Sequence, residues 1–266
     1  MTRIDPCRSS DGDHPNDVAN MRAAIPADAP GLPSTRRWLL AAGALLAGGA
    51  LWQGLPSAFA LSEAAVLLPP PGRDLQAGSG MQTAVLAGGC FWGVQGVFQH
   101  VEGVASAVSG YAGGDQVSAV YGAVGSGRTG HAEAVRIRYD PRRISYGRIL
   151  QIYFSVAHDP TQRNRQGPDI GPQYRSAVFP QDAEQALVAR AYIAQLDAAR
   201  LFPAPLATTI EMGNAFYPAE AYHQDYMAHN PSDGYIVAFD RPKLDNLRRV
   251  FPEHYRETPV LVGTGT

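Results

Sequence analysis

Cysteine is nearly absent from this chain: only Cys7 and Cys90 occur among its 266 residues. Two cysteines cannot build a disulfide scaffold, and they exclude a zinc site made mainly of thiolates. An excess of one charge is lacking too, since the net charge is −2 and Lys243 is the only lysine after residue 60. A near-neutral chain lacks the excess of Lys and Arg that binds nucleic acid, so no nucleic-acid partner is expected. The sequence contains no internal repeat.

The first 60 residues are typical of a leader. Residues 1–35 are polar and without periodicity, and we expect them to be disordered. Residues 36–60 begin with two arginines, continue as a short glycine-rich apolar run and end in Ala58-Phe59-Ala60. This pattern predicts a twin-arginine-like signal peptide cleaved after Ala60, hence export to the periplasm without stable membrane association. An uncleaved anchor and a later translation start at Met21 are the alternatives.

Cleavage after Ala60 would remove Cys7 and leave Cys90 as the only thiol in an oxidising compartment. Residues 61–80, rich in proline and glycine, predict a linker. We expect one folded domain over residues 81–250 and a short polar tail over 251–266.

Residues 83–94 are the stretch around which the domain is organised. An apolar run predicts a strand, Gly88-Gly89 a tight turn, and Val94, Val97 and Phe98 recur at helical spacing. Cys90 is therefore expected at the entrance of a helix, where free N–H groups and the helix dipole favour a thiolate. The adjacent Phe91 and Trp92 offer an aromatic surface for an apolar or sulfur-bearing group. A buried structural cysteine is the alternative.

Residues 131–139 predict the clearest strand. Glu133 shares one face with Val135, Ile137 and Tyr139, whereas Arg136 and Arg138 lie on the other face. A carboxyl on an apolar face has a raised pKa and can serve as a proton donor near neutrality. The alternative is a glutamate at a strand end that reaches solvent or an arginine.

Further patterns predict strands over 104–112, 174–179 and 206–212. They predict helices after Ser145, over 182–199 and over 219–230, with a polar loop that ends at Gln173. Because the strands and helices are irregularly spaced, and the strand of Glu133 alternates instead of being apolar throughout, the pattern favours a mixed α+β sandwich over a doubly wound parallel sheet.

Several motifs for other chemistries are incomplete. The glycine turn lacks the Gly-Lys-Ser/Thr of a phosphate loop, and the G-x-G spacing of a dinucleotide site is missing. His223 and His229 are six residues apart, so they are expected on the surface or at helix caps and not as a metal pair. Nothing in the spacing of His131, His158 and Asp159 supports a Cys–His–Asp hydrolase. We expect neither metal nor cofactor.

A group of motifs, taken together, resembles the A-type peptide methionine sulfoxide reductases over about residues 83–230. They are Gly89-Cys90-Phe91-Trp92-Gly93, Gly110-Tyr111-Ala112-Gly113-Gly114, Thr129-Gly130-His131-Ala132-Glu133, His158-Asp159-Pro160, Gln173-Tyr174-Arg175-Ser176, Phe216-Tyr217-Pro218-Ala219-Glu220 and Tyr222-His223-Gln224. The resemblance implies a two-layer α+β sandwich with a ferredoxin-like core and long surface loops.

The same resemblance implies an activity, the reduction of methionine S-sulfoxide, free or in proteins, to methionine. Cys90 would be the nucleophile and would end as a sulfenic acid, and Glu133 would protonate the sulfoxide oxygen. Tyr121 and Tyr174 would hydrogen-bond that oxygen, and Asp169 would shape the site. Phe91 and Trp92 would hold the S-methyl group.

Many members of that family resolve the sulfenic acid with further cysteines, but none follows Cys90 here. We expect an external reductant instead, either a thioredoxin-like or glutaredoxin-like protein or a small thiol. Two other functions use the same residues: a thiol peroxidase or redox sensor, and a non-catalytic binder of oxidised methionine.

Overall fold

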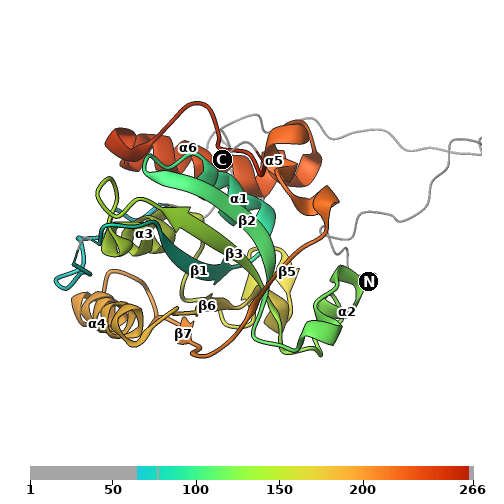
Figure 1. Ribbon diagram of the computed structural model, residues 1–266, viewed down its shortest axis with the longest axis horizontal. Coiled ribbons are helices and arrows are strands. Elements are labelled where there is room, and N and C mark those ends of the chain that lie inside the picture. The colour runs from blue at the N-terminus through green and yellow to red at the C-terminus, as the bar shows by residue number, and fades with distance from the viewer. Residues whose placement is uncertain (1–64, 77, 264–266) are drawn as a thin grey trace, which may run out of the picture. The chain divides into compact units, whose positions relative to one another are not determined.

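A six-stranded sheet with the order β7-β6-β1-β3-β2-β8 forms the centre of the fold in the computed structural model (Figure 1). The structure describes residues 65–76 and 78–263, so the expected leader and signal peptide lie outside the described residues. The strands are β1 Gln82–Gly88, β2 Val104–Ala112, β3 Ala132–Tyr139, β6 Ser176–Val178, β7 Thr209–Ile210 and β8 Phe216–Pro218. Neighbours are antiparallel except β6 and β7, which are parallel. A separate hairpin joins β4 Arg165–Gln166 to β5 Asp169–Ile170.

Helices connect these strands. The α-helices are α1 Phe91–Gln99, α2 Tyr121–Val124, α3 Tyr146–Ile152, α4 Ala183–Ala199, α5 Tyr226–His229 and α6 Arg241–Val250. Two π-helical segments span Tyr153–Ala157 and Ile236–Asp240, and single 3₁₀ turns span Gln116–Ser118, Pro172–Tyr174, Ala221–His223 and Pro252–His254. None of the helices within the described ranges has both the length and the apolar composition that a membrane span requires.

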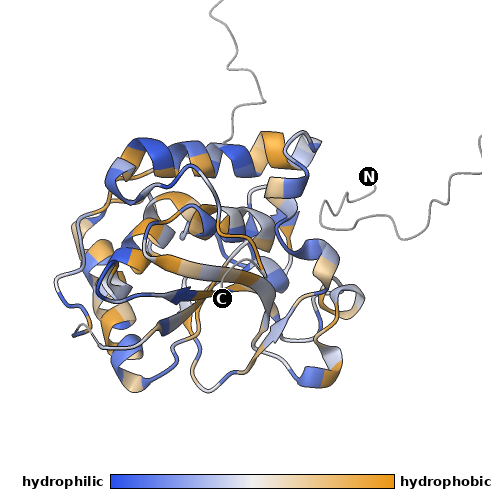
Figure 2. Ribbon diagram, turned by 45° about the horizontal axis from the view of Figure 1, so that its top comes forward, coloured by the Kyte–Doolittle hydropathy of each residue, from blue (hydrophilic) through white to orange (hydrophobic). Residues whose placement is uncertain are grey.

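The core lies mainly between the sheet and one layer of helices. Val135 and Ile137 of β3 join a large apolar cluster with residues of α1, α3, α4 and α6, whereas Ala132 and Ala134 face a small second cluster closed by Phe179. Figure 2 shows hydrophobic residues concentrated in the sheet and on the helix faces turned toward it. The succession β1-α1-β2-β3-α3-β6 is the β-α-β-β-α-β unit of ferredoxin-like folds. The predicted α+β two-layer sandwich is thus confirmed.

Part of the predicted linker is packed onto the domain. Leu68 is 1% exposed and belongs to the main core. The side chain of Gln151 donates to the carbonyl of Leu68 at 2.6 Å, and the Tyr192 hydroxyl donates to that of Pro69 at 2.7 Å. Proline-rich backbone keeps its carbonyl acceptors, so α3 and α4 can hold a segment that has few N–H donors of its own.

The C-terminal part differs from the sequence prediction in two places. The helix predicted over 219–230 is broken, because Asp225 adopts a left-handed conformation with φ of 58° and its N–H donates to the side chain of Gln95. Helix α6 was not predicted at all. It is rich in charged residues, and Leu244, Leu247 and Val250 are its only apolar side chains besides Pro242, so its apolar stripe is regular but narrow.

We predict that Gly110→Ala lowers the free energy of unfolding by about 1–3 kcal/mol, measured in urea. A Cβ at Gly110 would lie 2.3 Å from both the Phe216 ring and the Tyr217 carbonyl, so β8 could not keep its place beside β2. Gly80→Ala is the control, because nothing lies within 4 Å of its Cβ position. Equal stability of the two variants would contradict this account.

Candidate active site

Cys90 lies at the turn between β1 and α1, immediately before the first helical residue. Gly89 has φ of 90°, and a Cβ there would lie 2.5 Å from Gln166, so only glycine fits this turn. Cys90 is 1% exposed. Its position is the predicted one, at a helix N-terminus where backbone N–H groups lack helical partners.

Glu133 reaches this turn from the neighbouring strand. Its Oε2 accepts a hydrogen bond of 3.0 Å from the backbone N–H of Phe91, the residue after Cys90. The side chain is 2% exposed, which excludes the alternative of a solvent-facing glutamate. Its partner on the same face of β3, Val135, is fully buried, as the alternation predicted. The carboxyl group therefore lies at the start of α1, against the backbone of the residue that follows Cys90.

Tyr121 is the first residue of α2, and Glu220 holds it in place. The Tyr121 N–H donates to Glu220 Oε1 at 2.9 Å, and the Tyr111 hydroxyl donates to Glu220 Oε2 at 2.8 Å. Burial alone would raise the pKa of Glu220, but these hydrogen bonds keep its pKa below the ordinary value. Glu220 is thus a functional candidate whose role the sequence analysis missed, although its motif was noted.

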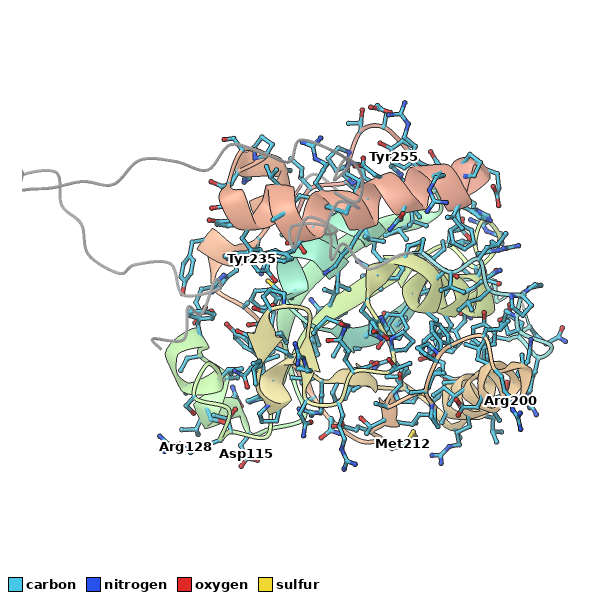
Figure 3. All side chains as sticks on the ribbon, turned by 180° about the vertical axis from the view of Figure 1, so that it is seen from behind. Asp115, Arg128, Arg200, Met212, Tyr235 and Tyr255 are labelled. Atoms are coloured by element: carbon cyan, nitrogen blue, oxygen red, sulfur yellow. The ribbon has the colours of Figure 1, made fainter. Side chains whose placement is uncertain are left out.

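Trp92 is held by three side chains from the C-terminal part. Its ring stacks on Tyr226 with centroids 3.7 Å apart and meets Tyr235 edge-on at 6.2 Å. Its indole N–H donates to Nδ1 of His223 at 3.3 Å. Tyr235, labelled in Figure 3, precedes the π-helical segment that leads into α6. Its hydroxyl donates to Asp169 Oδ2 at 2.6 Å, so Asp169 of β5 is connected to Trp92 through Tyr235.

His223 was expected on the surface or at a helix cap, but it is buried and is the last residue of a 3₁₀ turn that Gln224 caps. The side chain is fully buried, and its ring lies 5.0 Å from that of Phe91 and 4.5 Å from that of Tyr121. Burial lowers the pKa of His223 to about 4, against the opposing effect of Glu220. Because Nδ1 accepts from Trp92, the neutral ring carries its proton on Nε2. His229, by contrast, is exposed.

Tyr174 and His158 lie near the turn between β1 and α1. Tyr174 is 3% exposed and comes two residues before Ser176, which pairs with Gly88 at the end of β1. His158 packs directly against Gly88. Its Nδ1 donates to the Tyr153 carbonyl, so Nε2 accepts from the Ser176 hydroxyl at 2.7 Å. Burial lowers the pKa of His158 to about 3.

Geometry therefore brings the seven predicted site residues to one end of the sheet, where α2, the β4–β5 hairpin and α5 lie in both Figure 1 and Figure 3. The arrangement offers a thiol, a neighbouring carboxyl, tyrosine side chains and an aromatic wall. Such a set suits nucleophilic attack combined with proton transfer. Within the described ranges, no group of His, Cys, Asp or Glu is arranged to hold a metal ion.

Comparison with known proteins gives one consistent result. The family model for peptide methionine sulfoxide reductase matches residues 82–255. A peptide methionine sulfoxide reductase (MsrA 2) of Mesorhizobium japonicum is 60% identical over 189 residues, which cover 71% of this chain and 97% of that protein. A protein of the same name from Synechocystis is 46% identical over 199 residues, which cover 73% of this chain and 93% of that protein. The crystal structure of reduced Mxr1 from Saccharomyces cerevisiae superimposes with a TM-score of 0.51 and 30% identity, covering 60% of this chain and 92% of that one.

We predict that the folded protein loses stability as the pH falls from about 6.5 toward 4. In that range the unfolded chain protonates both His158 and His223, whose pKa values are depressed in the fold, so protonation favours unfolding. By about pH 5 the loss should reach roughly 1–2 kcal/mol for each histidine, measured by urea unfolding at several pH values. His223→Gln should flatten this dependence, whereas the exposed control His229→Gln should not. An unchanged slope in His223→Gln would contradict the assignment.

Proposed function

Because the chain belongs to the peptide methionine sulfoxide reductase family, and is thereby an oxidoreductase that reduces methionine sulfoxide, we propose that Cys90 and Glu133 carry out the reduction. The observation that supports this proposal is the hydrogen bond between Glu133 Oε2 and the N–H of Phe91. It holds the carboxyl group next to the residue that carries the thiol. A proton donor and a nucleophile are the two groups that the reaction needs.

In the proposed first step, the Cys90 sulfur attacks the sulfoxide sulfur while Glu133 donates a proton to the sulfoxide oxygen. The oxygen then passes to Cys90, which becomes a sulfenic acid, and methionine is released. The methionine sulfur gains two electrons and the cysteine sulfur loses two, so the step balances without a cofactor. Only the neutral form of the Glu133 carboxyl group can donate this proton.

The remaining predicted residues are proposed to bind the substrate. Tyr121 and Tyr174 donate hydrogen bonds to the sulfoxide oxygen, and Phe91 and Trp92 contact the S-methyl group. Asp169 acts indirectly, since it accepts from Tyr235, whose ring meets Trp92. The family resemblance implies selectivity for the S epimer of the sulfoxide, in peptides and in free methionine.

Regeneration is proposed to use an external thiol. No cysteine follows Cys90 in the sequence, so the sulfenic acid cannot form an internal disulfide with a later cysteine. One thiol condenses with the sulfenic acid to a mixed disulfide and releases water. A second thiol then frees Cys90 and leaves as a disulfide. A thioredoxin-like or glutaredoxin-like protein, or a small thiol, can supply both equivalents.

We also propose that the enzyme acts in the periplasm after export by the twin-arginine route. Arg36-Arg37 and Ala58-Phe59-Ala60 support this location. There the substrates are envelope proteins whose methionines have been oxidised.

Turnover of the two epimers of a methionine sulfoxide peptide, with several thiol donors, tests the roles of Cys90 and Glu133. Cys90→Ser should abolish turnover, and Glu133→Gln should reduce kcat about 10²–10⁴-fold with little change in KM. Glu102→Gln, which changes a half-exposed carboxylate, is the matched control. Full activity of Glu133→Gln would remove Glu133 from its role. Retained function of Cys90→Ser would indicate a binder, and faster consumption of peroxide than of sulfoxide would indicate a peroxidase.

Mass spectrometry of protein recovered from the periplasm tests regeneration and export together. After reaction with sulfoxide in the absence of thiol, the chain should begin at Leu61 and carry one added oxygen on Cys90; with thiol present, a mixed disulfide should appear. A Cys7–Cys90 disulfide would contradict both proposals, because it requires a retained leader and an internal resolving thiol.

A further inference from the structure

A buried ion pair lies behind the helix that begins after Cys90. Lys243 of α6 contacts Asp240 at the end of the preceding π-helical segment, with Nζ 3.2 Å from Oδ1 and side-chain exposures of 8% and 0%. Lys243 is the only lysine in the chain, and it is the only buried lysine or arginine among the described residues. None of the proposed catalytic steps uses either residue.

The pair touches the first turn of α1. A Cβ at Gly93, three residues after Cys90, would lie 2.1 Å from Asp240 Oδ1 and 3.1 Å from Lys243 Nζ. Gly93 is therefore the residue that allows a buried charge pair to approach the helix this closely. One helical turn separates Gly93 from Cys90, so the ammonium group lies within about 10 Å of the Cys90 backbone.

The positive end of the pair extends toward the β1–α1 turn. Lys243 lines a cavity of about 20 Å³, room for one water, together with Gln166, Asp169 and Tyr235. Gln166 in turn packs on Gly89. Besides burial, the charge of Lys243 lowers the pKa of His158, which packs on Gly88.

Stability alone does not account for this pair. Burying two charges costs several kcal/mol, and replacing such pairs by apolar residues is often neutral or stabilising. Asp240 is fully buried; burial raises its pKa, and Lys243 opposes that shift. Asp240 Oδ2 also has no hydrogen-bond partner among the described residues.

We propose that Lys243 is a positioning residue for Cys90. Its ammonium group, which Asp240 holds in place and keeps charged, increases the fraction of Cys90 present as thiolate. The proposal rests on the assigned role of Cys90 as nucleophile, because the thiolate is the attacking form. The other ionisable side chains around the first turn of α1 include the acidic Glu133 from β3, Asp169 from β5, Glu220 and Asp240 and the imidazoles of His158 and His223. Tyrosine hydroxyl groups also surround it, those of Tyr111, Tyr121, Tyr226 and Tyr235. Both histidines have depressed pKa values and are neutral at pH 7, so Lys243 is the one cation of this group.

The thiolate fraction can be measured directly from the ultraviolet absorbance of the thiolate during a pH titration. The full chain with Cys7→Ser carries Cys90 as its only thiol, and the same chain with Cys90→Ser provides the background from tyrosines. Lys243→Met removes the cation. Asp240→Asn combined with Lys243→Met removes both charges, so it tests the cation without leaving a buried carboxylate unpaired. Arg249→Met removes an exposed cation of the same helix and is the matched control.

Both Lys243 variants should have a higher Cys90 pKa, with the thiolate-to-thiol ratio at pH 7 reduced about three- to tenfold. Their kcat/KM should fall by a similar factor at neutral pH and recover as the pH is raised, which a purely structural loss would not do. Arg249→Met should match the parent. A folded double variant whose thiol titrates like the parent overturns the proposal. The titration does not depend on turnover, so failure of the reductase assignment would be seen separately, in the sulfoxide assay.

Discussion

The hydrogen bond from the Phe91 N–H to Glu133 joins the start of α1 to the strand β3 in the middle of the sheet. Two constraints make this bond possible. Gly89 allows a left-handed turn after β1, and the alternation of β3 turns Glu133 toward the helix layer. The bond satisfies one of the N–H groups that a helix leaves open at its N-terminus. It thereby fixes the Glu133 carboxyl group relative to the backbone that carries Cys90, the two residues to which the proposed mechanism assigns the chemistry.

The other elements of the site are too short to be stable by themselves. Helix α2 has four residues and β5 has two. Each is tied to the fold by a carboxylate that accepts from a fixed donor. Glu220 accepts from the N–H of Tyr121, and Asp169 accepts from the hydroxyl of Tyr235. The acidic residues of this region thus hold the aromatic residues in place, and the C-terminal segment completes a site that begins at β1.

The parts of the fold with strong local patterns were predictable, and the parts fixed by distant contacts were not. The β1-Cys90-α1 unit and the inward face of β3 follow from periodicity and glycine chemistry, and both are confirmed. The burial of His223 depends on Trp92, which lies 131 positions earlier in the chain. The break at Asp225 depends on Gln95 and on the N–H of Val262, which donates to its carboxylate. The residues that neighbour His223 and Asp225 in the sequence do not indicate such distant partners. The only sequence signal that these positions matter was the presence of the family motifs that contain Glu220 and His223.

A chain with one catalytic thiol depends on controlling access to it. Cys90 is 1% exposed, so the side chains over it keep water and bulky oxidants from the sulfur. In the proposed mechanism the same burial would protect the sulfenic acid from further oxidation, which is irreversible from the sulfinic stage on in most proteins. In the proposed mechanism no cysteine after Cys90 resolves the sulfenic acid, so an external thiol has to reach the same buried sulfur as the sulfoxide. The burial of Cys90 among aromatic side chains would therefore limit the access of both the substrate and the reductant in the proposed mechanism.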